Sequence, residues 1–313
     1  MNNLRIIFMG TPDFAVPSLQ KLLNSGYEIA AVVTAPDRPA GRGMHLSESP
    51  VKKFALSKEL KILQPEKLKD PEFTGQLKKL KADIQIVVAF RMLPEIVWNM
   101  PPMGTINVHG SLLPQYRGAA PINWAIINGE KETGVTTFKL KHEIDTGDIL
   151  LQEKIPIGDT ETAGELHDRM KEIGAGLLLE TITKLTNKEL QETSQASVLP
   201  TAENYQHLHH APKISTEICE INWEKSTDEI YNLIRGLSPY PAAFTLLNGK
   251  KLKIFRAEKE MMPVKESPGE IVSDHKSFLK FTCDNGYIAL QQLQLEGKKK
   301  MNVGDFLRGW RDN

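Results

Sequence analysis

Short apolar runs alternate with amphipathic stretches through the first third of the chain. Residues 4–9 are almost entirely apolar and end at a Gly-Thr-Pro turn, after which apolar residues recur at helical spacing from Phe14 to Leu23. Further apolar runs stand at 29–33, 84–89 and 105–108, with a helical pattern over 65–81. This repetition predicts an α/β fold, in which helices cover both faces of a Rossmann-like, mostly parallel sheet.

The pattern changes further along the chain. Residues 133–140 and 149–157 predict a strand pair, and 163–185 predict a long amphipathic helix. A polar stretch without periodicity at 187–212 is typical of a surface linker. After it we expect a helix at 227–237 and a small β-barrel or sandwich, built from short strands at 242–247, 252–257, 269–272, 278–282 and 287–295. We therefore divide the chain into a first domain, 1–188, a linker, 189–210, and a smaller domain, 211–313.

Composition narrows the class of protein. The 313 residues carry 39 Lys and Arg against 39 Asp and Glu, and 40% are hydrophobic, which is the balance of a globular protein rather than a disordered one. Zero formal net charge argues against wholesale electrostatic binding of nucleic acid, but it leaves room for local basic patches.

Apolar run lengths and cysteine spacing indicate the cellular compartment. No apolar run approaches the roughly 20 residues of a membrane-spanning helix, and residues 4–9 are too few for the core of a secretion signal. Cys219 and Cys283 have neither metal-ligand nor disulfide spacing, so we expect small buried thiols in a reducing compartment, the cytoplasm.

Candidate chemistry gathers around the 105–108 run. Asn107 and His109 stand two residues apart on a predicted strand, so their side chains point to one face near its carboxyl end, where open α/β sheets bind ligands. An asparagine amide can donate to an oxyanion, and a histidine can donate or shuttle a proton near neutral pH. Asp145, in a loop between two later strands, could orient and charge His109.

Other interpretations stay open at this point. His109 could be an ordinary polar residue at a strand end. His142, Glu143, Asp145 and Asp148 could be metal ligands, but no known metal-binding spacing accompanies them, and we expect no metal. A nucleophile elbow is missing near His109, which disfavours covalent catalysis. Residues 10–15 lack the second and third glycines of a dinucleotide fingerprint, which weakens a hydride-transfer interpretation.

Basic residues gather in a second place. Prolines and glycines predict a long loop at 34–49, which carries Arg38 and Arg42 and is followed by Lys52; this composition suits phosphate contacts. Lysine-rich turns at 250–253 and 298–300 could follow a phosphate backbone or could simply be solvated hairpin turns.

These motifs together resemble a known family. Asn-Val-His at 107–109 running into Ser-Leu-Leu-Pro at 111–114, with Asp-Thr-Gly-Asp at 145–148, is similar to the formyltransferases that use 10-formyltetrahydrofolate. Within the family, residues 8–15 and 36–43 resemble the branch that formylates methionine carried by initiator tRNA, and the resemblance extends to residues 237–243.

The resemblance implies roles for particular residues. It makes Asn107, His109 and Asp145 the catalytic set, and it assigns folate binding to Ser111, Leu112, Leu113, Pro114, Phe90, Arg91, Met92 and Leu93. It assigns tRNA binding to Arg42, which would sense the acceptor end, and the basic composition of the same region adds Arg38 and Lys52 as tRNA-binding candidates. It also implies an OB-like, tRNA-binding C-terminal domain, 10-formyltetrahydrofolate as cosubstrate and initiator methionyl-tRNA as acceptor. We further expect a monomer without a membrane partner.

Rival functions remain. Formylation of a sugar-nucleotide amine would use the same chemistry on a similar frame, although the arginine-bearing loop argues against it. Formylation of glycinamide ribonucleotide would need only the first domain, so the second domain counts against it. A non-catalytic RNA-binding protein would have no use for intact Asn107, His109 and Asp145.

Overall fold

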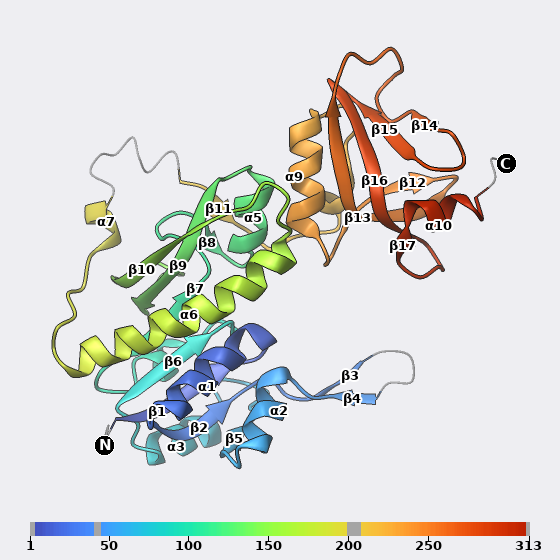
Figure 1. Ribbon diagram of the computed structural model, residues 1–313. Helices are drawn as coiled ribbons and strands as arrows, with labels where there is room; N and C mark the ends of the chain where they lie inside the picture. Colours follow the sequence, from blue (N-terminus) through green and yellow to red (C-terminus); the bar gives the residue numbers. More distant parts are fainter. Residues whose placement is uncertain (1–3, 41–44, 199–207, 311–313) are drawn as a thin grey trace. The chain divides into compact units, whose positions relative to one another are not determined.

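The computed structural model describes residues 4–40, 45–198 and 208–310 (Figure 1). The chain divides into two compact units. The first comprises Met1–Arg117, Gly134–Ile155 and Asp168–His209, and the second comprises Gly118–Thr133, Pro156–His167 and His210–Asn313. Two inner segments of the predicted first domain thus group with the C-terminal part, and the division at 188 and 211 stays a prediction.

A seven-stranded sheet forms the first unit, with the strand order β10-β9-β7-β6-β1-β2-β5. The strands are β1 (Arg5–Gly10), β2 (Glu28–Val33), β5 (Ile62–Leu63), β6 (Ile84–Val88), β7 (Thr105–His109), β9 (Glu132–Lys139) and β10 (Ile149–Pro156). The pairs from β5 to β7 are parallel, and β7 and β9 are antiparallel. The predicted Rossmann-like, mostly parallel sheet is confirmed.

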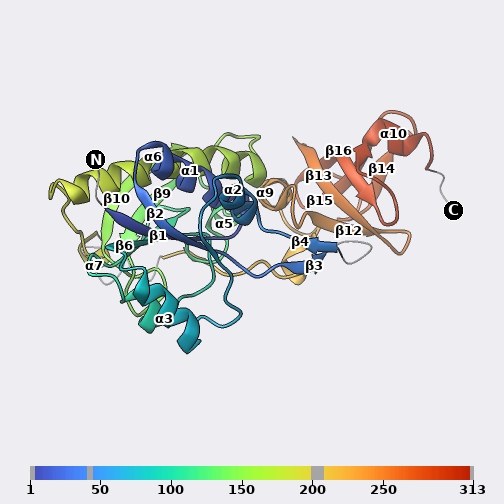
Figure 2. The same ribbon diagram turned by 90° about the horizontal axis from the view of Figure 1, so that it is seen from below.

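Helices cover both faces of this sheet. Figure 2 shows α1 (Val16–Asn24) and α6 (Ala163–Thr186) on one face and α3 (Pro71–Lys79) on the other. On the α3 side, Ile7 and Met9 of β1 are buried in one cluster with Phe73 and Leu77 of the helix, as the alternation of a strand dictates. The first unit also contains the short helices η1 (Asp13–Ala15), α2 (Pro50–Ser57), α4 (Glu95–Trp98) and α7 (Gln195–Val198).

Two expectations for the first unit are wrong. The helix expected over 65–81 is only α3, because Pro71 begins it directly after the N-cap Asp70, whose carboxylate accepts the backbone N–H of Glu72 at 2.7 Å. The loop expected at 34–49 contains an antiparallel hairpin, β3 (Arg38–Ala40) and β4 (His45–Ser47). Pro39 is tolerated because a two-stranded ribbon leaves one side of each strand without a partner.

The predicted linker is attached to the first unit at both of its described ends. Thr193 and Ile149 exchange two backbone hydrogen bonds of 2.8 and 2.9 Å, and the carbonyl of His209 accepts the N–H of Tyr116 at 2.7 Å. Backbone groups make these contacts, so side-chain periodicity gives no sign of them. The short strands β8 (Arg117–Gly118) and β11 (His210–Ala211) fall where the chain passes from one unit to the other.

The second unit contains a curled antiparallel sheet of six strands, consistent with the predicted OB-like domain. In sheet order they are β12 (Ala243–Leu247), β13 (Lys250–Met261), β16 (Gly286–Leu295), β15 (Leu279–Cys283) and β14 (Ile271–Ser273), with β17 (Met301–Asn302) paired to β16. The helices of the unit are α5 (Pro121–Ile127), η2 (Glu217–Cys219), α9 (Thr227–Leu237) and α10 (Val303–Leu307). None of the described helices is long and apolar enough to cross a membrane.

The core of the second unit lies between α9 and this sheet. Ile230 and Ile234 of the helix are buried with Leu252, Ile254 and Phe281 of the strands. Both cysteines are buried in the same core, as expected from the sequence, and burial raises the pKa of the Cys219 and Cys283 thiols.

A capping box begins α9 at the predicted residue. The Ser226 hydroxyl accepts the N–H of Glu229, and the Glu229 carboxylate accepts the Ser226 N–H at 3.1 Å and its hydroxyl at 2.7 Å. Hydrogen bonds from Ser226 and Lys225 lower the pKa of Glu229 to about 2. The folded state therefore favours the ionised carboxylate over the protonated one.

We expect Glu229→Gln to keep the capping geometry but to remove the contribution of residue 229 to the pH dependence of folding stability. Above pH ~5 the wild-type protein should be more stable by about 0.3–1 kcal/mol, because an anion near a helix N-terminus is favourable. The depressed pKa makes this advantage disappear as the pH falls from ~5 to ~2. Urea unfolding of both proteins across this range, with hydrogen exchange in α9, measures the difference; a difference that does not change with pH would contradict the account.

Candidate active site

β7 carries two of the three predicted catalytic residues to the carboxyl end of the parallel strands. The strand pairs with β6 on one side and β9 on the other, so its alternation is fixed by two neighbours. Asn107 is half-buried, and His109, the last residue of β7, is 6% exposed. The expectation that both residues lie near this end of the sheet agrees with the fold.

Polar atoms lie near both nitrogens of the His109 ring. Nε2 lies 2.9 Å from the carbonyl oxygen of Tyr116, and because a carbonyl only accepts, Nε2 carries a proton and donates it. Nδ1 lies 3.8 Å from Oδ2 of Asp145. The edge of the ring meets buried Phe138, with ring centroids 6.4 Å apart. The tautomer and tilt of the imidazole are thereby defined, with Nδ1 toward the carboxylate.

Asp145 reaches His109 from a turn that folds back along the sheet. The last residue of β9, Lys139, pairs with Ile106 of β7, whereas His109 pairs with Thr136, three residues earlier in β9. The loop that follows β9 must therefore run back along β7 by about three residues, roughly 10 Å, to bring Asp145 to His109. Asp145 itself has a φ of 54°, in the left-handed region.

Gly147 makes this return possible. A Cβ at Gly147 would lie 1.6 Å from the carbonyl oxygen of Lys139, so the turn packs against the end of β9 more closely than any side chain allows. Two of the three remaining candidate metal ligands have other neighbours: Asp148 pairs with Lys141 at 2.7 Å, and Nδ1 of His142 lies 3.6 Å from Glu95. The structure therefore favours a carboxylate–histidine pair over the metal interpretation of this loop.

The predicted folate-binding segment after β7 is fixed by buried hydrogen bonds. The Thr136 hydroxyl donates to the carbonyl of Ser111 at 2.7 Å and accepts the N–H of Leu113 at 3.1 Å. Gln152 donates to the Leu113 carbonyl at 2.8 Å, and the Ser111 hydroxyl donates to the Gln115 carbonyl at 2.6 Å. Ser111 and Leu113 are buried, so their side chains support the segment, and Leu112 and Pro114 flank Leu113.

The second predicted folate segment, residues 90–93, meets the first through Leu140. Leu140 packs against the cluster of Leu113, Phe138 and Ile149, and also against the cluster that holds Leu93. Phe90 packs on the second cluster, whereas Met92 is 73% exposed. Arg91 turns back and donates to the backbone carbonyls of Pro65 and Glu66. Burial lowers the pKa of Arg91, opposed by Glu66 and reinforced by the charge of Arg38.

The predicted tRNA-binding residues have different surroundings. Arg38 is exposed on β3. Lys52 is partly buried and pairs with Asp37 and, at 3.0 Å, with Glu48; these hydrogen bonds raise the pKa of Lys52. Gln64 completes the base of the hairpin by donating to Asp37 and to the Ala35 carbonyl, both at 2.9 Å. Arg42 lies outside the described residues.

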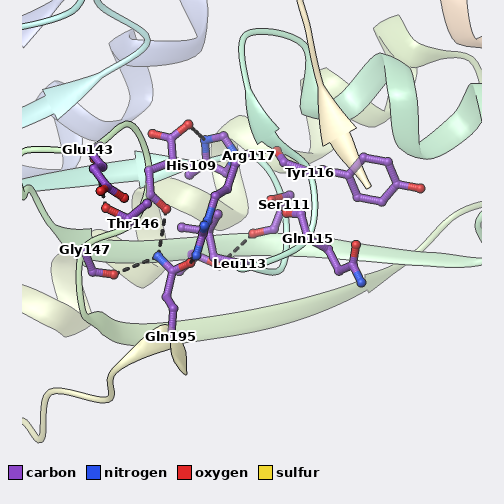
Figure 3. Close-up of polar contacts among 12 residues, drawn as sticks. His109, Ser111, Leu113, Gln115, Tyr116, Arg117, Glu143, Thr146, Gly147 and Gln195 are labelled. Atoms are coloured by element: carbon purple, nitrogen blue, oxygen red, sulfur yellow. Dashed lines mark hydrogen bonds and ion pairs between the residues drawn. The ribbon is translucent and has the colours of Figure 1, made fainter. Parts of the chain in front are cut away.

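Sequence reasoning missed several supporting residues. Four side chains hold the segments around His109, yet they stand in unrelated strands, turns and the predicted linker: Thr136, Gln152, Arg117 and Gln195. Figure 3 shows Arg117 and Gln195 in the same region as His109. A buried glutamine in a polar stretch has no local signal, because the groups it satisfies lie far away in sequence.

Comparison with known proteins identifies the class. Residues 4–182 match the formyl transferase family, and residues 213–311 match the formyl transferase C-terminal domain. The chain belongs to the formyltransferase family, as its motifs indicated.

Particular relatives are similar along nearly the whole chain. Methionyl-tRNA formyltransferase of Bacteroides fragilis is 50% identical over 313 residues, which are 98% of this chain and 95% of the relative. Methionyl-tRNA formyltransferase of Phocaeicola vulgatus is 53% identical over 315 residues, covering 99% of this chain and 96% of the relative.

Solved structures share the fold. An N-formyltransferase from Helicobacter canadensis, in complex with folinic acid and dTDP-3-aminofucose, has a TM-score of 0.68 at 20% identity and covers 95% of this chain and 100% of its own. HypX from Aquifex aeolicus, in complex with tetrahydrofolic acid, has a TM-score of 0.65 at 19% identity. It covers 100% of this chain, which spans about half of HypX, 49%.

We expect Gly147→Ala to reduce activity through the turn that carries Asp145. The added Cβ forces that turn away from Lys139 and moves the carboxylate relative to His109, and a displacement of ~1 Å can lower turnover about 100-fold. Gly75→Ala in α3 is the matched control, since its Cβ meets nothing within 4 Å. Steady-state formyl transfer by the two variants tests this, and equal activity would show that the close approach is unimportant.

Proposed function

We propose that this chain transfers the formyl group of 10-formyltetrahydrofolate to the free α-amino group of methionyl-initiator tRNA, giving N-formylmethionyl-tRNA for translation initiation. The observation that carries the proposal is 50% identity over 98% of the chain to a protein named methionyl-tRNA formyltransferase. The similarity includes the Asn107, His109 and Asp145 segments and the second unit alike. A shared fold alone would not distinguish one amine acceptor from another.

In the proposed reaction the α-amine attacks the formyl carbon, the new C–N bond forms, and the formyl oxygen becomes an oxyanion. Because Nε2–H of His109 is engaged with Tyr116, Nδ1 is the ring atom available to the reaction. The Asp145 carboxylate lies 3.8 Å from Nδ1 and would pair with a His109 cation that is protonated on both ring nitrogens. The Nδ1–H of that cation and the Asn107 amide are the proposed oxyanion donors. Collapse breaks the bond to the folate nitrogen, which takes up a proton as the amine loses one, with Asp145 assisting, directly or through a water.

The residues around Leu140 are compatible with the formyl donor. A pterin is flat, with apolar faces and polar edges, and the contacts of Leu140 with the clusters of Leu113 and Leu93 provide apolar surface between the two predicted folate segments. Since the side chains of Ser111 and Arg91 are engaged with backbone carbonyls, we infer that these segments contact the folate through backbone groups and through exposed Met92.

Two arginines are proposed to contact tRNA: Arg38 of β3, and Arg42, which lies outside the described residues. The ion pairs of Lys52 with Asp37 and Glu48 support a role for Lys52 in holding the hairpin base rather than in reaching phosphate. In the second unit, the predicted turn at 250–253 is instead the beginning of β13, whereas residues 298–300 follow the end of β16. Because Leu252 pairs with Leu295, both groups of lysines lie at one end of the β13–β16 ladder. Their grouping supports a basic surface suited to a phosphate backbone. We further infer a monomer that works in the cytoplasm, where translation consumes its product.

The proposal is tested by offering the purified protein 10-formyltetrahydrofolate with initiator methionyl-tRNA, elongator methionyl-tRNA or a nucleotide-linked amino sugar. We expect turnover selective for the initiator. Asn107→Ala and His109→Ala should each lower kcat about 10²- to 10³-fold, as for loss of an oxyanion donor. Asn99→Ala, an exposed asparagine of the same unit, is the control. Turnover of the amino sugar alone would overturn the acceptor, and inactivity on every acceptor would overturn the function.

A second experiment separates recognition of tRNA from recognition of folate. Arg38→Ala should raise the KM for methionyl-tRNA and reduce the salt dependence of tRNA binding by about one phosphate contact, while folate binding is unchanged. Lys78→Ala, which removes an exposed charge from α3, serves as the control. Equal losses of tRNA binding and folate binding in Arg38→Ala would contradict the proposal that Arg38 recognises tRNA and not folate.

A further inference from the structure

Gln195 is a buried side chain in the segment that the sequence presents as a surface linker. It begins the short helix α7 and is 3% exposed. Its Nε2 lies 2.8 Å from the carbonyl oxygen of Asp145 and 2.8 Å from that of Gly147. Its Oε1 lies 3.0 Å from Nε and 2.6 Å from a terminal nitrogen of Arg117. Figure 3 shows the amide of Gln195 between Gly147 and Arg117.

Chemistry fixes the orientation of this amide. Carbonyl oxygens only accept and a guanidinium only donates, so the nitrogen of Gln195 must face Asp145 and Gly147, and its oxygen must face Arg117. Both N–H groups and both lone pairs are used. No other neutral side chain of this length offers two donors and an acceptor in the same plane, so we expect substitutions here to be poorly tolerated in function.

The two ends of the amide reach the two segments that hold the His109 ring. Arg117 directly follows Tyr116, whose carbonyl accepts the Nε2 proton of His109. At the other end, Asp145 faces Nδ1 with its side chain while its own carbonyl is held by Gln195. The guanidinium–amide–carbonyl chain therefore connects the segment that binds Nε2 with the turn that faces Nδ1.

The backbone of the predicted linker supports this placement. Thr193, two residues before Gln195, exchanges two backbone hydrogen bonds with Ile149, the first residue of β10. Gln195 thus approaches the Asp145 turn from a position attached to the strand that follows that turn. A side-chain substitution at 195 leaves these backbone bonds in place, so its effect can be assigned to the amide.

We propose that Gln195 is a positioning residue for formyl transfer, which holds the Asp145 turn in register with the Tyr116–Arg117 segment so that the carboxylate faces Nδ1 of His109. This inference rests on the proposed function, because the activity to be measured is that reaction. Gln195 acts through Asp145 and touches neither the formyl group nor the amine. Its contribution is to the geometry of the reacting groups rather than to the binding of either substrate.

Gln195→Met keeps the length of the side chain and removes its hydrogen bonds. We expect kcat to fall about 10- to 100-fold, with the KM values for tRNA and for 10-formyltetrahydrofolate changed less than 2-fold, because misplacement of a reacting group affects the chemical step. Gln195→Glu should be at least as impaired, since a carboxylate would face two carbonyl oxygens. Gln85→Met is the matched control: Gln85 is 1% exposed and accepts a hydrogen bond from Thr105 in the same sheet, so its loss should affect stability but not kcat.

A double-mutant cycle with Asp145→Asn separates positioning from a merely structural role. If Gln195 acts through the carboxylate, Gln195→Met should lower kcat less than 2-fold in the Asp145→Asn background, whereas a general loss of structure would lower it by the same factor in both backgrounds. Should Gln195→Met not fold by circular dichroism, Arg117→Lys, which weakens the other end of the chain of hydrogen bonds, is run through the same cycle. Additive effects, or a change confined to KM, would overturn the inference. An inactive wild-type protein would overturn the proposed function instead.

Discussion

The structure of the first unit around the candidate site depends on the two polar contacts of the His109 ring. Its Nε2 is fixed by a carbonyl 2.9 Å away and its Nδ1 faces a carboxylate 3.8 Å away, and these two partners come from segments about thirty residues apart in the sequence. The hydrogen bond to Tyr116 weakens steeply with distance and angle, so that segment must be held to within a few tenths of an ångström, and the Asp145 turn must keep its carboxylate within ion-pair distance of Nδ1. The strand that carries His109 cannot supply this precision alone. The supports lie in β9, in β10 and in the chain that follows α6.

The supporting side chains are buried and polar, so each of them requires hydrogen-bond partners. Thr136 and Gln195 each satisfy several backbone groups at once, and each is almost without solvent contact. A buried polar group that lost its partner would be strongly unfavourable, so a network of this kind has few alternative arrangements. The same property that makes it sensitive to substitution gives the site one well-defined geometry before substrates arrive.

The sheet order explains why the site forms where it does. β7 lies between parallel β6 and antiparallel β9, so the ends of parallel strands and the return from an antiparallel strand meet beside one residue. In a fully parallel sheet the loop bearing Asp145 would emerge beside His109 at the carboxyl ends of the strands, whereas here it follows an antiparallel strand that ends at the level of Ile106 and must return along β7. The left-handed backbone of Asp145 and the close approach of Gly147 to Lys139 are local consequences of the return.

Elements with local signals could be predicted before the fold was known. Apolar periodicity predicted β1, α1, β7, α6 and α9 near their observed bounds, and the Asn-Val-His and Asp-Thr-Gly-Asp motifs indicated the family and its candidate catalytic set. Features that depend on residues far apart in the sequence became visible only in the folded chain. Hydrogen bonding across the hairpin placed strands in the proline-containing loop, the N-cap and Pro71 shortened α3, and long-range contacts buried Gln195 in an apparent linker. Apolar periodicity within one segment shows which side of an element faces the core. A buried hydrogen bond between distant residues leaves no pattern in either segment alone.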